Sequence, residues 1–197
     1  MHLNVKRFRQ THSLDCVNWP SQYPYKPTVK FSIAHDSDSI FLEFEVVEKW
    51  SRALADDMGK IWEDSTVEVF LSPNPEDGLY YNIECNCAGS LLVRAGHGRH
   101  GRESAPDSVI AGVKRFSTVE NRHFDSEYVP VWNLALIIPK ETFFLHDVKT
   151  LDGAHFRGNI YKCGDALPEP HFISFAPIAT AEPDFHRPEF FADIDFE

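Results

Sequence analysis

Two features are scarce in this sequence of 197 residues, and each shortage excludes a class of protein. No apolar run is long enough to cross a bilayer as a helix. Lys and Arg together number 19 against 30 Asp and Glu, which gives a formal net charge of −11. A nucleic-acid-binding surface needs positive charge to displace the counterions of the phosphates. We therefore expect no membrane insertion and no binding to nucleic acids or anionic membranes, whereas a neutral ligand is compatible with this charge.

Cysteine is also scarce, at four residues, and no Cys-x-x-Cys pair occurs. Four cysteines are too few for a fold that depends on disulfides. We expect buried thiols at Cys16, Cys85, Cys87 and Cys163, although one disulfide remains possible if the protein is secreted. The first residues, MHLNVKRFRQTHSLD, lack the apolar segment of a secretory signal. The protein is then either intracellular or has lost its signal, and the sequence does not choose between the two.

Apolar residues are plentiful, at 43% of the chain, and Phe alone occurs 16 times. This supply is sufficient for a large core and argues against a disordered chain. The sequence shows no internal repeat and no linker between domains. We therefore expect a single domain over residues 1–197, a monomer, with an irregular lead-in at 1–25 where Pro20 and Pro24 interrupt regular structure.

Apolar and polar residues alternate in many short segments, which is the pattern of half-buried β-strands. The expected strands are 28–34, 40–46, 66–71, 80–87, 91–94, 109–119, 128–138, 156–161, 171–176 and 190–196. Clusters of Pro, Gly, Asn and Asp separate them. The expected loops are 48–63, with room for a helical turn, and 95–108, and the only helix of note is expected at 139–145. This pattern predicts an all-β sandwich or barrel.

A row of polar side chains is expected on one face of the hairpin formed by the third and fourth strands. The members of this row are Glu68, Asn82, Glu84 and Asn86. Trp62 lies just before the first of the two strands. Amides and carboxylates exchange hydrogen bonds with hydroxyls in a fixed plane, and an aromatic ring packs against the C–H face of a pyranose. The combination favours a carbohydrate site, while a simple solvent-exposed sheet face would show the same pattern.

A second candidate segment lies near the C-terminus, between Pro183 and Pro188. It contains Phe185, His186 and Arg187, and the two prolines restrict the backbone around them. A rigid loop of this composition can present side chains to a ligand. The alternative is a tucked-in terminal loop whose Phe residues complete the core.

The motifs in these segments resemble those of the family 9 carbohydrate-binding modules and their relatives among the DOMON-like β-sandwiches. Residues 62–71, WEDSTVEVFL, are similar to the family's aromatic residue followed by an Asp-x-x-Val-Glu strand. Residues 82–89, NIECNCAG, are similar to its next strand, which ends in Asn-x-x-Gly. Further segments that fit the family or a subgroup of it are 132–139, 157–162 and 185–190. The resemblance extends from about Pro27 to the C-terminus.

This resemblance implies a jelly-roll-like β-sandwich of two antiparallel sheets with at most one or two short helices. It also implies non-catalytic binding of a mono- or oligosaccharide between aromatic side chains, in the recognition or breakdown of polysaccharides. The ligand-binding residues expected on this basis are Trp62, Glu68, Asn82, Glu84, Asn86, Arg157, Phe185, His186 and Arg187. The chain offers Phe185 and His186 where a second stacking Trp is expected. No cofactor is expected, because no contiguous acidic loop indicates the calcium that some members bind.

Three other functions remain open at this point. A glycoside hydrolase could use Glu68 and Glu84, since retaining enzymes hold two carboxyls about 5–5.5 Å apart. A haem- or metal-binding sandwich would depend on His97, His100 or Met58, whose spacing matches no ordered ligand set. A protein-interaction module would expose an apolar patch in place of a polar cleft with an aromatic rim.

Overall fold

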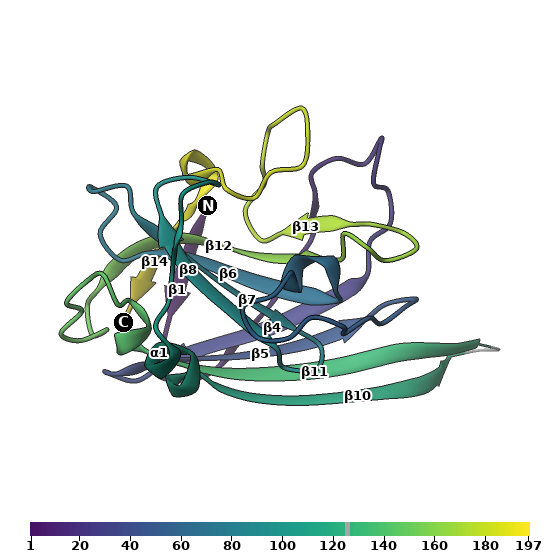
Figure 1. Ribbon diagram of the computed structural model, residues 1–197, viewed down its shortest axis with the longest axis horizontal. Coiled ribbons are helices and arrows are strands. Elements are labelled where there is room, and N and C mark those ends of the chain that lie inside the picture. The colour runs from purple at the N-terminus through teal and green to yellow at the C-terminus, as the bar shows by residue number, and fades with distance from the viewer. Residues whose placement is uncertain (125–126) are drawn as a thin grey trace.

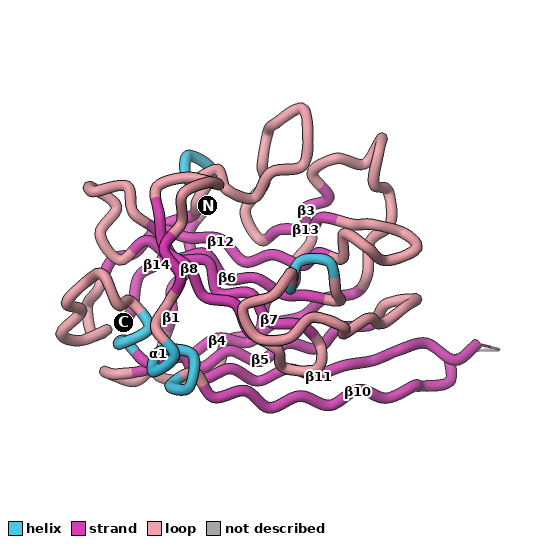
Figure 2. The backbone as a smooth tube through the Cα atoms, in the orientation of Figure 1, coloured by secondary structure: helices cyan, strands magenta, loops and turns pink. Residues whose placement is uncertain are grey.

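Two β-sheets pack face to face in the computed structural model, which describes residues 1–124 and 127–197 (Figures 1 and 2). The larger sheet contains, in spatial order, β1 (His2–Val5), β14 (Ala192–Phe196), β12 (His155–Cys163), β6 (Thr66–Ser72), β7 (Tyr80–Asn86), β8 (Leu91–Gly96) and β9 (Glu103–Ser104). β13 (Phe172–Ser174) pairs with the second half of β12, and β3 (Cys16–Val17) pairs with β13. The smaller sheet contains, in spatial order, β10 (Lys114–Phe124), β11 (Glu127–Pro139), β5 (Ser39–Val47), β4 (Thr28–His35) and β2 (Gln10–Ser13). The expected all-β sandwich is therefore confirmed.

The main core lies between the two sheets and follows from the alternation along each strand. In β4, Val29, Phe31 and Ile33 are buried in this core, while Lys30 and Ser32 lie on the opposite face. Strands of the larger sheet contribute in the same way, so that the inward faces of both sheets form one continuous apolar cluster. Burial of this apolar surface is the main favourable term for folding.

A second apolar cluster covers the outer face of the larger sheet, so its central strands are buried on both sides. Every residue of β6 and β7 is buried. The members of the cluster are Trp19, Phe70, Tyr80, Tyr161, Cys163, Ile178, Phe185 and Phe191. Some belong to the strands, and others come from the loops that precede β4 and β14. A solvated face is therefore the wrong explanation for the polar row on these strands.

The N-terminal 25 residues are not the irregular lead-in that we expected. β1 adds a parallel strand beside the C-terminal β14 and buries Leu3 and Val5 in the main core. β2 pairs with β4, and β3 pairs with β13. Each of these strands has four residues or fewer and is stabilised by a partner that is distant in sequence. Local alternation is therefore too short to reveal them.

The strand expected at 109–119 begins only at Lys114, because a short helix, α1 (Asp107–Gly112), replaces its first part. Ile110 and Val113 are three residues apart, and this spacing lets both reach the main core from a helical turn. In such a short segment the apolar residues fit both the two-residue period of a strand and the 3.6-residue period of a helix. Their spacing alone could not decide between the two.

The helix expected at 139–145 is reduced to the 3-10 turn η2 (Lys140–Thr142). The chain leaves the turn at once because Phe143 packs edge-to-face against Tyr81 and Phe156 in the core. Two further 3-10 turns are η1 (Ile61–Glu63), inside the loop expected at 48–63, and η3 (Pro188–Phe190). The loop expected at 95–108 also contains β9 and the beginning of α1.

Candidate functional site

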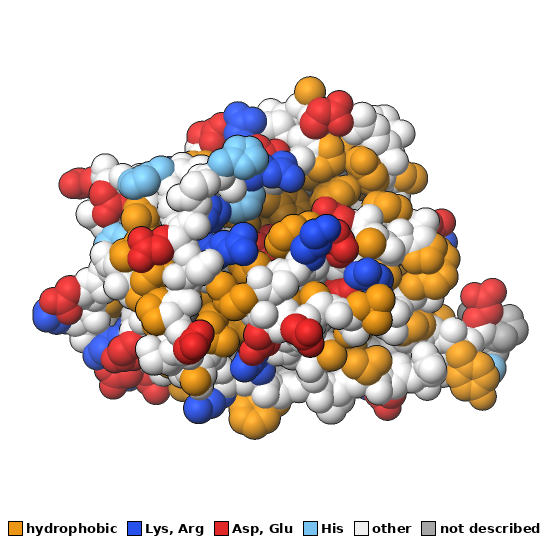
Figure 3. Space-filling model, viewed as in Figure 1, with side chains coloured by type: hydrophobic (Ala, Val, Ile, Leu, Met, Phe, Trp, Pro, Cys, Tyr) orange, Lys and Arg blue, Asp and Glu red, His pale blue; other side chains and the backbone are white. Residues whose placement is uncertain are grey.

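A cleft of about 480 Å³ opens on the outer face of the larger sheet. Its floor is formed by strands β6, β7, β8 and β12, and its sides by η1 and by loops before β4, after β8, after β12 and before β14. The residues that line this cleft are Tyr23, Trp62, Glu68, Asn82, Glu84, Arg94, Arg99, His100, Arg102, Cys163, Asp165, Phe172, Glu182, Pro183, Asp184, Phe185 and His186. Figure 3 shows this side of the molecule, where Arg, Lys and His side chains gather around a hollow with hydrophobic side chains inside it.

Two carboxyl groups lie side by side on the floor of the cleft. The register of β6 and β7 places Glu68 directly opposite Glu84, and each is 4% exposed. Glu68 Oε1 accepts a hydrogen bond from Cys163 Sγ at 3.0 Å, and Glu84 Oε1 accepts one from Asn82 Nδ2 at 2.7 Å. Within the part of the chain that the structure describes, Glu84 Oε2 has no hydrogen-bond partner. A buried acceptor without a partner is energetically costly, and Glu84 is one of the residues that line the cleft.

Burial controls the protonation of this pair. Burial, and next the neighbouring carboxylate of Glu84, hold the pKa of Glu68 well above its ordinary value. Burial also raises the pKa of Glu84 to about 7, although hydrogen bonding from Asn82 and the charge of Arg94 oppose the rise. Two adjacent buried carboxyls do not both ionise easily, so the pair retains a proton near neutral pH. The floor can therefore both donate to and accept from a hydroxyl.

Arg102 holds the amide of Asn82 in one orientation. Its Nε donates to Asn82 Oδ1 at 2.8 Å, while its other nitrogens donate to the carbonyls of Tyr80 and Gly98, both at 2.8 Å. The guanidinium carbon lies 4.3 Å from the centre of the Tyr80 ring. Arg94 lies beside it, and its buried Nε has no partner among the described residues. A donor and an acceptor without partners in the described chain thus belong to two residues that line the cleft, on the neighbouring strands β8 and β7.

Aromatic side chains form the rim. Trp62 belongs to η1 and is partly exposed. Tyr23 and Phe172 are also partly exposed and pack edge-to-face with ring centres 4.8 Å apart. Phe185 stacks on Tyr161 at 4.1 Å and is 7% exposed. The sequence interpretation missed Tyr23 and Phe172 because neither belongs to a recognisable motif, and only the fold brings them to the cleft.

Six of the nine residues expected to bind ligand line the cleft, namely Trp62, Glu68, Asn82, Glu84, Phe185 and His186. His186 Nδ1 lies 2.9 Å from the Tyr80 hydroxyl. Burial, and next the charges of Arg102 and Arg99, lower the pKa of His186 to about 3. His186 is therefore a neutral hydrogen-bonding group of the wall.

The other three expected residues lie outside the lining and contact the backbone or neighbouring side chains. Asn86 Nδ2 donates to Asp64 at 2.9 Å, and its Oδ1 accepts from the backbone N–H groups of residues 88 and 90. Arg157 donates to the Phe191 carbonyl at 2.6 Å. Arg187 is paired with Glu189 at 2.5 Å. Asn86 contacts the buried Asp64 at the end of β7, and the two arginines contact residues of the C-terminal segment, so ligand binding by these three residues stays a prediction.

Asp64 anchors the loop that carries Trp62. This carboxylate is fully buried, and its Oδ2 accepts from the backbone N–H groups of Leu54 and Ala55 at 3.0 and 2.9 Å. It also accepts a hydrogen bond from Asn86 Nδ2 and forms an ion pair with Arg52. These contacts tie the loop to the end of β7 and position the aromatic residue at the mouth of the cleft.

A buried ionic cluster connects both sides of the cleft beneath its floor. Lys162 Nζ lies 2.9 Å from Glu48 Oε2 and 2.8 Å from His171 Nε2, and Trp132 Nε1 donates to Glu48 Oε1 at 2.6 Å. Burial, and next the charge of Lys162, lower the pKa of His171 to about 3, so its ring accepts from the ammonium group. Glu48 begins the Trp62 loop and His171 immediately precedes Phe172, so the cluster fixes both walls.

The described residues form neither a metal site nor a membrane-spanning helix. Over residues 1–124 and 127–197, no group of three or more His, Cys, Asp or Glu side chains is placed to hold a metal ion. In the same ranges, no helix has the length and apolar character needed to cross a membrane.

Comparison with known proteins places this geometry among carbohydrate-binding domains. The model of carbohydrate-binding family 9 matches residues 2–196. A candidate carbohydrate-binding protein from Bacteroides uniformis has a similar structure, with 45% sequence identity and a TM-score of 0.87 over 95% of this chain and 86% of that chain. None of the curated proteins matches this chain.

Two further solved structures are similar in fold. One is a family 9 module from Caldicellulosiruptor kristjanssonii in complex with cellotriose, with a TM-score of 0.63 and 9% identity over 100% of this chain and 94% of that chain. Another, from the same organism and in complex with glucose, has a TM-score of 0.57 and 10% identity over 98% and 95% of the two chains. At such low identity, these two likenesses show the fold alone.

Proposed function

Because the chain belongs to carbohydrate-binding family 9, we propose that its cleft binds a neutral mono- or oligosaccharide and performs no chemistry on it. The observation that carries this proposal is the floor, where a carboxyl oxygen of Glu84 and an N–H of Arg94 on the neighbouring strand both lack a hydrogen-bond partner among the described residues. A buried polar atom without a partner is costly, and a ligand hydroxyl that supplies both a donor and an acceptor removes this cost.

The rim fits the other half of a sugar's chemistry. The C–H face of a pyranose is apolar and packs against an aromatic ring, and Trp62, Tyr23 and Phe172 offer such rings beside the polar floor. Floor and rim together favour binding free energies of roughly 4–8 kcal/mol, which correspond to dissociation constants from millimolar to micromolar. Glucose and cellotriose, which the two similar modules hold, are the first ligands to test.

The arrangement of Glu68 and Glu84 supports binding and argues against hydrolysis. A glycosidase places its two carboxyls on either side of the scissile bond, so that one can protonate the leaving group while the other acts on the opposite face of the sugar. Here both carboxyls project from adjacent strands of one floor, and each is hydrogen-bonded within it. A sugar that lies on this floor contacts both carboxyls from the same side.

Isothermal titration calorimetry with glucose, xylose and cellotriose tests the binding, and a reducing-sugar assay on the same proteins tests the absence of hydrolysis. We expect binding to at least one of these sugars and no release of reducing ends from cello-oligosaccharides or xylan. Failure to bind any sugar, on this panel or on a broad glycan array, would contradict the binding proposal. Hydrolysis that disappears in Glu68→Gln would contradict the non-catalytic part.

A further inference from the structure

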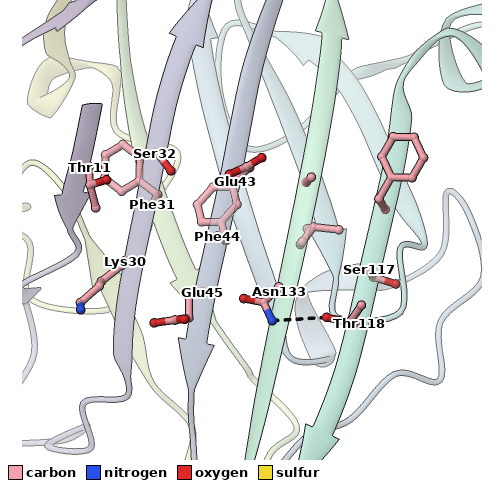
Figure 4. Close-up of a pocket in the computed structure, with 13 residues that line it drawn as sticks. Thr11, Lys30, Phe31, Ser32, Glu43, Phe44, Glu45, Ser117, Thr118 and Asn133 are labelled. Atoms are coloured by element: carbon pink, nitrogen blue, oxygen red, sulfur yellow. Dashed lines mark hydrogen bonds between the residues drawn. The ribbon is translucent and has the colours of Figure 1, made fainter. Parts of the chain in front are cut away.

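A second hollow, of about 440 Å³, lies on the outer face of the smaller sheet (Figure 4). It crosses the strands β2, β4, β5, β11 and β10 and is distinct from the cleft, with which it shares no lining residue. We call this hollow the groove. Its outward-facing lining residues are Thr11, Lys30, Ser32, Glu43, Glu45, Phe116, Thr118, Asn133 and Ala135.

Strand register arranges these side chains in two parallel rows. One row runs from Lys30 through Glu45 and Asn133 to Thr118, with one residue from each of four neighbouring strands. The second row consists of Thr11, Ser32, Glu43, Ala135 and Phe116. Figure 4 shows Lys30, Glu45 and Asn133 side by side, with the amide of Asn133 bonded to Thr118.

Several polar groups of the first row have no partner among the described residues and are free for a ligand. Glu43 in the second row is paired with Arg9 at 2.5 Å. In contrast, Lys30 and Glu45 are cross-strand neighbours that form neither an ion pair nor a side-chain hydrogen bond with any described residue. Asn133 Nδ2 donates to Thr118 Oγ1 at 3.3 Å, which leaves the Asn133 carbonyl oxygen available. The row thus offers donors and acceptors whose opposite charges balance.

Phe116 supplies an aromatic surface at the end of the groove. Its side chain is 64% exposed, whereas half of the 16 Phe residues of this chain are buried. The neighbouring floor residue Ala135 is small, so a ligand can approach the backbone between Phe116 and the longer side chains of Glu43 and the first row. An exposed aromatic ring beside a polar row is the same combination that the cleft presents in enclosed form.

We propose that the groove is a second carbohydrate site, which binds the interior of an extended neutral polysaccharide that lies across the strands. Neighbouring strands are about 4.8 Å apart, so the first row repeats a polar group at nearly the length of one pyranose unit in an extended chain. The balanced charge of the row suits hydroxyls better than an ionic polymer. The choice of ligand class rests on the proposed function of the cleft, whereas the site itself is inferred from the side chains that line the groove.

Affinity electrophoresis in gels that contain hydroxyethyl cellulose, xyloglucan or galactomannan tests this proposal, with glucose calorimetry on the same proteins. The variants are Phe116→Ala with Glu45→Ala for the groove, Trp62→Ala for the cleft, and their combination. Phe124→Ala is the matched control, because this Phe is 46% exposed on the same strand and does not line the groove. Thermal melts of all variants verify folding, and polygalacturonate serves as the charged polymer.

We expect the groove variant to lose roughly tenfold or more of its affinity for at least one neutral polymer while its glucose affinity stays within about twofold. Trp62→Ala should lose glucose binding and keep part of the polymer retardation, which the combined variant then abolishes. The proposal is overturned if the groove variant and the Phe124 control are retarded equally, if Trp62→Ala alone removes all retardation, or if polygalacturonate competes best. Glucose binding without any polymer retardation overturns the groove alone, whereas a protein that binds no sugar overturns the function of the cleft as well.

Discussion

At the residue scale, Glu68 and Glu84 distinguish the cleft from an ordinary sheet face. Transfer of two carboxylates from water to an interior is expensive, and proteins usually avoid the cost through protonation or pairing. Here one partner is a thiol, one is an amide, and one carboxyl oxygen has no described partner. A site that accepts this cost in the free protein recovers it when a ligand fills the missing hydrogen bond.

Trp62→Ala should weaken sugar binding by at least about tenfold, or about 1.4 kcal/mol, because it removes the exposed ring at the mouth of the cleft. Calorimetry with the best sugar of the panel measures this loss. Trp50→Ala is the matched control, since Trp50 lies in the same loop but packs against Tyr25 and does not line the cleft. Equal affinities of the two variants would contradict the assignment of Trp62.

The raised pKa of Glu84 predicts how stability depends on pH. Between pH 4.5 and about 7 the unfolded chain ionises this carboxyl while the folded protein keeps it protonated, so its contribution to the free energy of unfolding falls as pH rises. A rise from 4.5 to about 7 corresponds to about 3 kcal/mol, all of which is lost above pH 7. Glu84→Gln should therefore be more stable relative to the wild type at pH 8 than at pH 5.

Urea unfolding of both proteins at the two pH values measures this difference. The comparison between proteins cancels the opposite trend of His171 and His186, whose lowered pKa values make the fold more stable as pH rises from about 3 to 6.5. Glu76→Gln, in the exposed turn between β6 and β7, is the control. An identical pH dependence of the wild type and Glu84→Gln would refute the prediction.

At the scale of elements, the floor of the cleft depends on the close approach of β12 to its two neighbouring strands. β12 lies between β14 and β6, and it approaches both because Gly158 has no side chain. A Cβ atom on Gly158 would lie 2.3 Å from the Phe70 carbonyl oxygen and 2.9 Å from side-chain atoms of Ile194 and Leu71. The strands can accommodate such a contact only if they separate.

Gly158→Ala should therefore reduce the free energy of unfolding by at least about 3 kcal/mol. Gly112→Ala is the control, because a Cβ at that position meets nothing within 4 Å, and we expect a change of less than about 1 kcal/mol. Chemical denaturation of the two variants provides the comparison. Similar stability of both variants would show that β12 can shift away from β6 at little cost.

At the scale of the whole molecule, the two outer faces of the sandwich differ. Loops and a second apolar cluster cover the larger sheet and leave one enclosed cleft. The outer face of the smaller sheet has no such cluster in the described chain, and β10 is exposed along its length. The long β10–β11 hairpin also extends past the end of β5, as Figure 1 shows. Under the two proposals above, the enclosed cleft takes a terminal or short sugar and the open face takes an extended chain.

The stability of the fold depends on packing, and the described residues form no disulfide. All four cysteines are free, and Cys16 is the only one that is not buried. Burial raises the pKa of Cys85 to about 12 and that of Cys87 to about 11, so reactive thiolate is scarce in the folded state. We expect at most one thiol to react rapidly with Ellman's reagent in the native protein and all four in denaturant without reductant. Fewer than four in denaturant would indicate a disulfide.

The sequence by itself determined the class of fold and part of the lining of the cleft. Alternation in 28–34 and 40–46 reflects one buried face per strand, a local signal that the fold preserves. The hairpin of β6 and β7 places Glu68, Asn82 and Glu84 on one face because side chains alternate with a period of two.

The tertiary structure alone decided what covers that face and what closes the cleft. Tyr23 and Phe172 reach the rim from segments about 150 residues apart, and β1 pairs with β14 across almost the whole chain. Asn86 has a side chain suited to contact a sugar, but it is hydrogen-bonded to the buried Asp64. Long-range packing sets these positions, and the periodicity of a single segment carries no information about the partner that will lie above it.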